Sequence, residues 1–256
     1  MSLKKYRLLK YPGAKWGSLS DIYTVWKSSG CHTFVDVFGG SGNVSLNVEA
    51  DKIIYNEVNE DLRNLFLTIK NRYKEFYAFA QQNGVSASAL KKVRNMEGET
   101  DVERAFSTLV KYNAGFGGMG DTYEAKNNGD GLTVIRRILQ QMPLWQDRLK
   151  AWDITGKDFR AIFETMDGED TFFYLDPPYF GKSWYVNNFK RSDYRDLQSY
   201  LKSLKGKYLL NMDTESKEAK SIFGNPQYIK KYPNRNGGGN EGRPEFRYLS
   251  FYTNVV

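Results

Sequence analysis

Apolar residues recur along the chain with two different periods, and these periods predict strands that alternate with helices. Apolar runs rich in β-branched and aromatic residues predict strands at 33–38, 52–55, 151–154, 171–175, 207–210, 227–231 and 248–253. Spacings of three and four residues predict helices near 17–29, 43–48, 60–70, 158–164, 192–204 and 215–222. This alternation is typical of an α/β fold whose sheet is largely parallel.

Residues 62–150 depart from this alternation. They hold helical patterns at about 72–82, 86–96, 100–114 and 131–149, with few runs of strand character between them. We therefore predict a helical subdomain at 62–150, inserted into a sheet domain formed by residues 1–61 and 151–256. The segment Asn113–Gly120 contains four glycines, which favours a surface loop between two of the helices.

Composition excludes several classes of protein for this chain. The 256 residues suffice for one large domain with a substantial core. Cys31 is the only cysteine and His32 the only histidine, which excludes an internal disulfide and a zinc site of the usual cysteine and histidine ligands, so we expect no metal. No run of 18 apolar residues and no apolar leader are present, so we expect no membrane segment and a reducing, cytoplasmic location.

The net charge of +7 is concentrated in the predicted insertion, where 14 basic side chains stand against 9 acidic ones. A basic excess together with 15% aromatic residues favours a nucleic-acid partner, although ordinary soluble proteins share this composition. The first candidates for contact with nucleic acid are Lys91, Lys92, Arg94, Arg136 and Arg137. A solvated helix face is the alternative for each of them.

A glycine-rich turn follows the strand at 33–38. Gly40 and Gly42 let the backbone approach a ligand closely, and the helix start after them presents free N–H groups. Glu57 ends the next strand, where a carboxylate can accept hydrogen bonds from both hydroxyls of a ribose. Because neither a P-loop nor a complete dinucleotide motif is present, S-adenosylmethionine fits this turn better than ATP or NAD. A plain strand-to-helix connection is the alternative.

Asp176-Pro177-Pro178-Tyr179 directly follows the strand at 171–175. The two prolines lack backbone N–H donors and hold the chain extended, so the Asp176 carboxylate and the nearby carbonyls are left as acceptors. Acceptors beside the flat ring of Tyr179 suit an amine on an aromatic ring, as in adenine or cytosine. The alternative is a strand that ends in a proline turn with a locally capping aspartate.

Together these motifs resemble, in content and order, the Dam-type family of DNA adenine-N6 methyltransferases over nearly the whole chain. The matching segments are Tyr11-Pro12-Gly13-Ala14-Lys15, Phe38–Gly42, Asn56-Glu57-Val58-Asn59, Asp158-Phe159, Asp176-Pro177-Pro178-Tyr179 and the tail from Asn236 to Tyr252. The family usually has aspartate where this chain has Glu57. The stretch Lys111–Gly120 matches only loosely, so the resemblance does not carry over a DNA recognition sequence.

This resemblance implies a Rossmann-like, S-adenosylmethionine-dependent methyltransferase sheet, with 62–150 as the helical target-recognition insertion and double-stranded DNA as the substrate. The implied cofactor-binding residues are Tyr11, Lys15, Asp36, Phe38, Gly40, Gly42, Glu57, Asp158, Phe159 and Asp176. The implied catalytic residues are Asp176, Pro177 and Tyr179. A bacterial cytoplasm is the implied place of action, for a bacterial or phage-encoded chain, and a restriction endonuclease acting on the same site is an allowed partner.

In the implied reaction the target adenine leaves the duplex, Asp176 and the Pro177 carbonyl accept the hydrogens of its amino group, and Tyr179 stacks on the base. Candidates for a second face of the base pocket are Phe180, Trp184 and Tyr185, and candidates for phosphate contacts nearby are Lys182, Lys190 and Arg191. Two alternatives stay open: an amine methyltransferase that acts on RNA adenine or on a protein glutamine, and a nucleic-acid-binding protein of the same fold without turnover.

Overall fold

The computed structural model describes residues 6–11, 13–94, 96, 98–115, 128–180, 189–214, 216–233 and 246–255, except the side chains of residues 87, 90, 94 and 128–130. The predictions for Pro12, Lys182, Trp184, Tyr185, residues 236–245 of the tail and the side chain of Arg94 lie outside the described residues, as does most of the Asn113–Gly120 loop.

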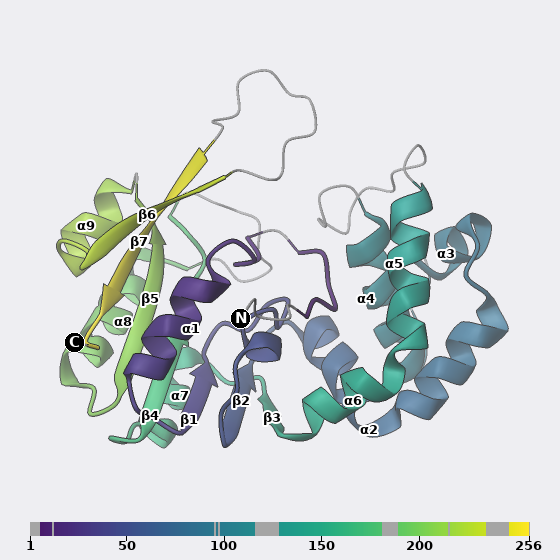
Figure 1. Ribbon diagram of the computed structural model, residues 1–256, viewed down its shortest axis with the longest axis horizontal. Coiled ribbons are helices and arrows are strands. Elements are labelled where there is room, and N and C mark those ends of the chain that lie inside the picture. Colours follow the sequence, from purple (N-terminus) through teal and green to yellow (C-terminus); the bar gives the residue numbers. More distant parts are fainter. Residues whose placement is uncertain are drawn as a thin grey trace.

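Within the described residues, seven strands form one sheet (Figure 1). The strands are β1 (Thr33–Asp36), β2 (Lys52–Asn56), β3 (Trp152–Thr155), β4 (Thr171–Leu175), β5 (Lys207–Asp213), β6 (Tyr228–Pro233) and β7 (Phe246–Thr253). Their order is β3-β2-β1-β4-β5-β7-β6, and β7 runs antiparallel to both of its neighbours while the other pairs are parallel. The predicted α/β class is therefore confirmed, and the largely parallel sheet is Rossmann-like.

The topology places a crevice at the ends of β1 and β4. The chain moves outward from β1 to β2 and β3, then returns to pair β4 with the other side of β1. Such a reversal of strand order leaves the carboxyl ends of the two central strands free to hold a ligand. Asp36 ends β1, and Asp176 directly follows β4.

Every residue of β4 is buried, because helices pack on both faces of the sheet. Phe172 and Tyr174 point into one core with α1 (Leu19–Ser28), and Phe173 and Leu175 point into the other. The second core contains α7 (Phe159–Met166), α8 (Arg191–Ser203) and α9 (Lys217–Phe223). A short 3-10 helix, Ser45–Asn47, follows the glycine turn where a helix start was predicted.

Between β2 and β3 lie α2 (Glu60–Asn83), α3 (Ala87–Arg94), α4 (Asp101–Ala114), α5 (Asn128–Gln140) and α6 (Met142–Lys150). The break predicted between the helices at 60–70 and 72–82 is present, because Arg72 has a non-helical backbone (φ −133°, ψ 32°) that kinks α2. The helix predicted at 131–149 is instead two helices, α5 and α6. The second break has a simple cause, since Pro143 has no N–H to continue a helix and is tolerated only in a first turn.

Side chains of the helical insertion and of the sheet share one apolar core. This core contains Phe34 and Phe172 of the sheet together with Phe66, Phe106 and Ile135 of the insertion. Figure 1 shows α2 to α6 beside the β3 edge and the β6–β7 hairpin with α9 at the opposite end of the sheet. The insertion therefore packs as an extension of the sheet domain, without an apolar core of its own.

An amino-terminal strap, residues 6–11, connects the two parts. Leu8 and Leu9 are fully buried. The side chain of Asn113 in α4 donates to the Leu8 carbonyl (3.1 Å) and accepts from the Lys10 backbone N–H (3.2 Å). Because Tyr11 follows immediately, α4 helps to fix the position of the first predicted cofactor residue.

Gly42 shows why the turn after β1 needs glycine. Its φ is +66°, and an added Cβ would lie 2.8 Å from the Phe66 ring and 3.1 Å from the Trp152 ring. Gly30 has a similar φ of +71° with open space around it. We expect Gly42→Ala to lower the free energy of unfolding by about 2 to 5 kcal/mol, the sum of left-handed strain and overpacking, and Gly30→Ala by only about 1 to 2 kcal/mol. Urea denaturation of both variants measures the difference, and equal losses would show that crowding at Phe66 is unimportant.

None of the helices in the described part of the chain combines the length and the apolarity needed to cross a bilayer.

Candidate active site

Two connected lobes form a cleft at the carboxyl ends of β1, β2 and β4. The larger lobe has a volume of about 200 Å³ and the smaller one about 40 Å³. Four residues line both lobes: Tyr11, Phe38, Gly40 and Asp176. Asp176 therefore lies at the junction, where a ligand extending through both lobes would pass it.

Glu57 lines the larger lobe at the end of β2 and is bound to the glycine turn. Its Oε2 accepts from the Gly40 N–H (2.6 Å), and its Oε1 accepts from the Asn59 N–H (2.8 Å). Burial raises the pKa of Glu57, although these N–H donors act in the opposite direction. The positive φ of Gly40, +50°, allows the turn to bring its N–H within reach of the carboxylate.

Asp36 and Asn43 hold buried polar atoms, without partners among the described residues, in the wall of the smaller lobe. Both residues line it and are almost fully buried, at 1% and 2% exposure. Ser45 donates to Asp36 Oδ2 (2.6 Å), but Asp36 Oδ1 and both side-chain polar atoms of Asn43 have no hydrogen-bond partner among the described residues. Buried polar atoms without partners are costly, so this lobe is built for a polar ligand.

The pKa of Asp36 is raised to about 7, mainly because burial disfavours the charged carboxylate. The charges of Asp176 and Glu57 raise it further, and the hydrogen bond from Ser45 opposes the shift. A cationic group in the smaller lobe would favour the ionised form.

Asp176 is held by the buried side chain of Lys15. Lys15 Nζ lies 2.5 Å from Asp176 Oδ2 and 2.9 Å from the Gly13 carbonyl, and 5.2 Å from the centre of the Tyr179 ring. Burial lowers the pKa of Lys15, and the Asp176 carboxylate partly restores it. The Lys15 side chain is 4% exposed and that of Asp176 is 18% exposed, so the carboxylate remains accessible from the cleft.

The backbone after Asp176 is fixed by its neighbours. Pro177 and Pro178 are buried, and Tyr194 of α8 donates its hydroxyl to the Pro178 carbonyl. The Pro177 carbonyl accepts no hydrogen bond within the described residues. Tyr179 is half-buried against the core on the α1 side. Asp176 and Pro177 thus offer oxygen acceptors on a rigid backbone.

Three phenylalanines from different elements surround one side of the larger lobe. Phe38 follows β1, Phe159 begins α7, and Phe189 precedes α8. The ring centres of Phe159 and Phe189 lie 5.2 Å apart. The ring centre of Phe38 lies 6.0 Å from that of Phe159 and 5.4 Å from that of Phe189. The three rings contact one another and form an apolar wall of the larger lobe, against which a flat heterocycle can lie.

The cleft brings together most of the residues that the sequence indicated as cofactor-binding. Those lining it are Tyr11, Lys15, Asp36, Phe38, Gly40, Glu57, Asp158, Phe159 and Asp176. Gly42 lines neither lobe and faces Phe66 and Trp152 instead. Pro177, Tyr179 and Phe180 also lie outside the lining. The Phe180 ring stacks on Tyr194 with 3.7 Å between ring centres.

The basic residues of the insertion lie away from the cleft lining. Lys91 and Lys92 on α3 and Arg136 and Arg137 on α5 are exposed. Arg136 donates to the Val85 carbonyl (2.8 Å), so it also secures the turn between α2 and α3.

Several lining residues were missed by sequence reasoning. Asn43, Tyr174 and Phe189 belong to no motif that the sequence suggested, and Asn56 lies in the matching segment 56–59 but had no role assigned to it. For Tyr174 a signal existed, because it is two residues before Asp176 and strand periodicity places alternate residues on one face. Phe189 could not be found, because its approach depends on how α8 packs.

No cluster of three or more histidine, cysteine or acidic side chains able to hold a metal occurs among the described residues.

Comparison with known proteins identifies the family. The profile of the family described as D12 class N6 adenine-specific DNA methyltransferase matches residues 11–235. The Type II methyltransferase M.CviBI of Paramecium bursaria Chlorella virus NC1A is 24% identical over 245 residues, which are 88% of this chain and 90% of that protein. The modification methylase StsI of Streptococcus sanguinis is 39% identical over 67 residues, which are 25% of this chain and only 10% of that methylase. Because the profile spans most of the sequence, the predicted resemblance is confirmed, and the chain belongs to the D12 class N6 adenine-specific DNA methyltransferase family.

Proposed function

We propose that this DNA adenine-N6 methyltransferase binds S-adenosylmethionine across the two lobes and methylates an adenine turned out of double-stranded DNA at Asp176. The observation that carries the proposal is the position of Asp176, which lines both lobes at the end of β4. A group bound in either lobe therefore lies next to the same carboxylate.

The polarity of each lobe supports this cofactor. Glu57 suits the ribose of a nucleoside, and the apolar wall of Phe38, Phe159 and Phe189 suits its adenine. In the smaller lobe, Asp36 Oδ1 and the Asn43 amide match the charged amino and carboxylate groups of a methionine. S-Adenosylmethionine, when bound, supplies an electrophilic methyl group on a positively charged sulfur.

The protein's own contribution is to orient and activate the acceptor amine. The lone pair of an adenine amino group is delocalised into the ring, which makes the nitrogen a poor nucleophile. Hydrogen bonds from the two N–H groups to Asp176 and to the Pro177 carbonyl favour the tetrahedral form of the nitrogen, and they strengthen as positive charge develops on it. Tyr179 stacks on the base and returns about 1 to 3 kcal/mol of the free energy spent on extracting it.

Lys15 keeps Asp176 available as an acceptor. It binds Oδ2 and leaves Oδ1 without a donor among the described residues. The Lys15 ammonium, 2.5 Å from Oδ2, holds the carboxylate in place, so the other oxygen is available to accept a hydrogen bond from the amine.

We assign DNA recognition to the helical insertion, residues 62–150, with Lys91, Lys92, Arg136 and Arg137 as phosphate contacts. A restriction endonuclease acting on the same DNA site is the partner we propose for cells in which the methylation is protective. RNA adenine and protein glutamine remain the alternative substrates for the same acceptor pair.

The test is transfer of a tritiated methyl group from labelled S-adenosylmethionine to unmethylated DNA, to RNA and to protein. We expect label in DNA, at N6 of adenine, and background counts in the other two. Label in RNA or protein, with none in DNA, would replace the proposed substrate, and no label in any of them would leave a binding protein without turnover.

Asn113 offers a test of the link between the insertion and the cofactor site. Asn113→Ala leaves the Leu8 carbonyl and the Lys10 N–H without their partner, and we expect the free energy of unfolding to fall by about 2 to 4 kcal/mol. We also expect about tenfold weaker binding of S-adenosylhomocysteine, because the strap positions Tyr11. Asn64→Ala, which removes an amide contact to Asp101 at the other end of α4, is the control and is expected to leave that affinity unchanged. Calorimetric titration of both variants with S-adenosylhomocysteine measures the two affinities.

A further inference from the structure

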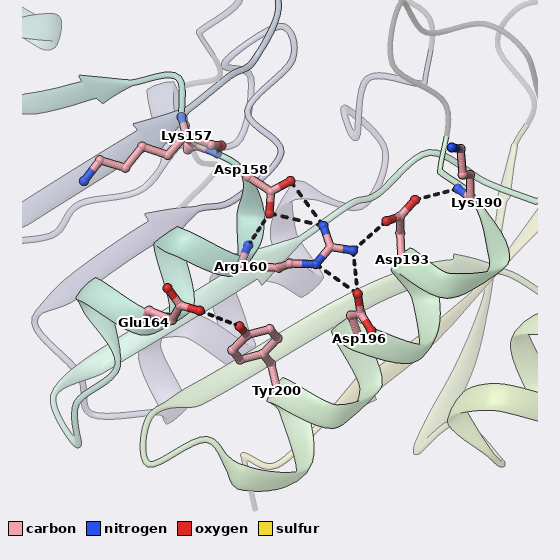
Figure 2. Close-up of polar contacts among 9 residues, drawn as sticks. Lys157, Asp158, Arg160, Glu164, Lys190, Asp193, Asp196 and Tyr200 are labelled. Atoms are coloured by element: carbon pink, nitrogen blue, oxygen red, sulfur yellow. Dashed lines mark hydrogen bonds and ion pairs between the residues drawn. The ribbon is translucent and has the colours of Figure 1, made fainter.

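Arg160 lies just outside the larger lobe and binds three carboxylates at once (Figure 2). Its Nη1 lies 3.2 Å from each carboxylate oxygen of Asp158. Its Nη2 lies 2.6 Å from Asp193 Oδ1 and also 2.6 Å from Asp196 Oδ2. Its Nε lies 2.9 Å from the same Asp196 oxygen. The hydrogen bonds to these carboxylates raise the pKa of Arg160, and those to Asp193 and Asp196 contribute most. The guanidinium therefore stays charged and joins α7 to α8.

One end of this cluster belongs to the lining of the cleft. Asp158 lines the larger lobe and caps α7, with its Oδ1 accepting from the Arg160 backbone N–H (2.9 Å). Asn56 fixes the preceding residue, because it accepts from the Lys157 N–H (2.8 Å) and donates to the Lys157 carbonyl (3.0 Å). The backbone position of Asp158 is thus set by β2, and the direction of its carboxylate is set by Arg160.

The other end reaches Phe189 on the opposite side of the lobe. Asp193 accepts from Arg160 through Oδ1 and from the Lys190 backbone N–H through Oδ2 (2.7 Å). Lys190 directly follows Phe189, which lines the lobe and faces Phe159 at 5.2 Å. Arg160 also lies over the Phe159 ring, with its guanidinium carbon 4.4 Å from the ring centre. A continuous set of charge-assisted hydrogen bonds therefore connects Asp158 with the chain next to Phe189.

The charge balance makes this connection depend on Arg160. A single guanidinium faces three carboxylates, and without it Asp158, Asp193 and Asp196 would repel one another across the junction of α7 and α8. In Figure 2 the side chain of Lys157 points away from the cluster and cannot replace the lost charge.

From this arrangement we infer that Arg160 is a positioning residue for the cofactor, which holds Phe159 and Phe189 together as one apolar wall and fixes the Asp158 carboxylate beside the heterocycle that lies against this wall. The inference rests on the proposed function, since it takes the larger lobe to be the adenosine site. Arg160 itself touches no reacting atom.

The test compares substitutions inside and outside the connection. Arg160→Gln removes the charge, and Asp193→Asn places an amide N–H against one of its two donors. For both variants we expect about tenfold weaker binding of S-adenosylhomocysteine and of adenosine, an equal rise in KM for S-adenosylmethionine, and a kcat within about twofold of the wild type. Arg160→Lys, which keeps the charge, should recover part of the affinity.

A matched control lies on the same pair of helices. Tyr200→Phe removes the hydroxyl bond to Glu164 (2.9 Å), which joins α7 to α8 farther along the pair (Figure 2). This variant should bind adenosine as the wild type does. The inference is overturned if Arg160→Gln and Asp193→Asn match this control, or if kcat falls while the affinities stay unchanged. Should Arg160→Gln not fold, Asp193→Asn against Tyr200→Phe decides the question. A wild-type protein that binds neither ligand would instead refute the proposed function.

Discussion

Asp176→Asn is expected to lower methyl transfer to DNA on the order of a thousandfold while DNA binding persists, because one preorganised electrostatic partner of the transition state is lost. The amide that replaces the carboxylate carries no charge to balance the amine as it becomes positive. Single-turnover transfer of tritium from S-adenosylmethionine measures the rate, and a gel-shift assay with the same DNA measures binding.

Asp170→Asn is the matched control, because Asp170 directly precedes β4 whereas Asp176 directly follows it. Asp170 binds the exposed His32 at the amino end of the strand, far from the cleft lining, so transfer should be unchanged. Retained transfer in Asp176→Asn would refute the catalytic assignment.

A double variant distinguishes a loss of catalysis from a loss of folding stability. Removing one partner of a buried ion pair typically costs about 3 to 5 kcal/mol, and Asp176→Asn leaves the buried Lys15 without its counter-charge. Combining Lys15→Met with Asp176→Asn removes both charges and should recover much of that stability. We expect the double variant to remain inactive. If recovered stability brought recovered transfer, the loss in the single variant would have been structural.

Much of the sheet could be predicted from the sequence, because its strands carry strong local signals. The run Thr171–Leu175 is apolar and aromatic at nearly every position, as a strand buried on both faces must be, and its end is marked by two prolines. Asp36, Glu57 and Asp176 could be placed at one edge for the same reason, since parallel strands bring their carboxyl ends together.

Contacts between elements distant in the chain could not be predicted. The pairing of Arg160 with Asp193 and Asp196 spans 33 and 36 residues, and the bond from Asn113 to Leu8 spans 105. No local pattern distinguishes these polar side chains from solvated ones. The position of Phe189 likewise follows from the packing of α8.

Asp36→Asn should increase the stability of the ligand-free protein at pH 8. The pKa of Asp36 is about 7 in the folded protein, against an ordinary value of 3.8 for an aspartate in the unfolded chain, so the folded protein holds the proton more tightly. This tighter binding of the proton stabilises the folded protein by roughly 4 kcal/mol. The stabilisation is fully present below pH 4 and is lost as the pH rises through 7. Asparagine does not titrate. We therefore expect a gain of roughly 2 to 4 kcal/mol at pH 8 and almost none at pH 4, measured by urea denaturation at both values.

The same substitution should weaken cofactor binding, which separates a binding role for Asp36 from a purely structural one. A hydrogen bond to a charged partner contributes about 1.5 to 3 kcal/mol, so S-adenosylhomocysteine should bind about 10- to 150-fold more weakly to Asp36→Asn. In the wild type the affinity should fall as the pH drops below 7, because a cationic amino group requires the ionised carboxylate and protonation of Asp36 removes it. In Asp36→Asn this pH dependence should disappear.

Two outcomes would contradict this account of Asp36. A variant that gained stability at pH 8 yet bound the ligand as tightly as the wild type would show that Asp36 Oδ1 faces no cationic group of the cofactor. A variant that lost stability at both pH values would show that its bond to Ser45 outweighs the burial of its charge. The combination we expect, higher stability with lower affinity, follows from one arrangement: a carboxylate kept in an apolar environment without a partner for one oxygen, at a free-energy cost that only the bound ligand offsets.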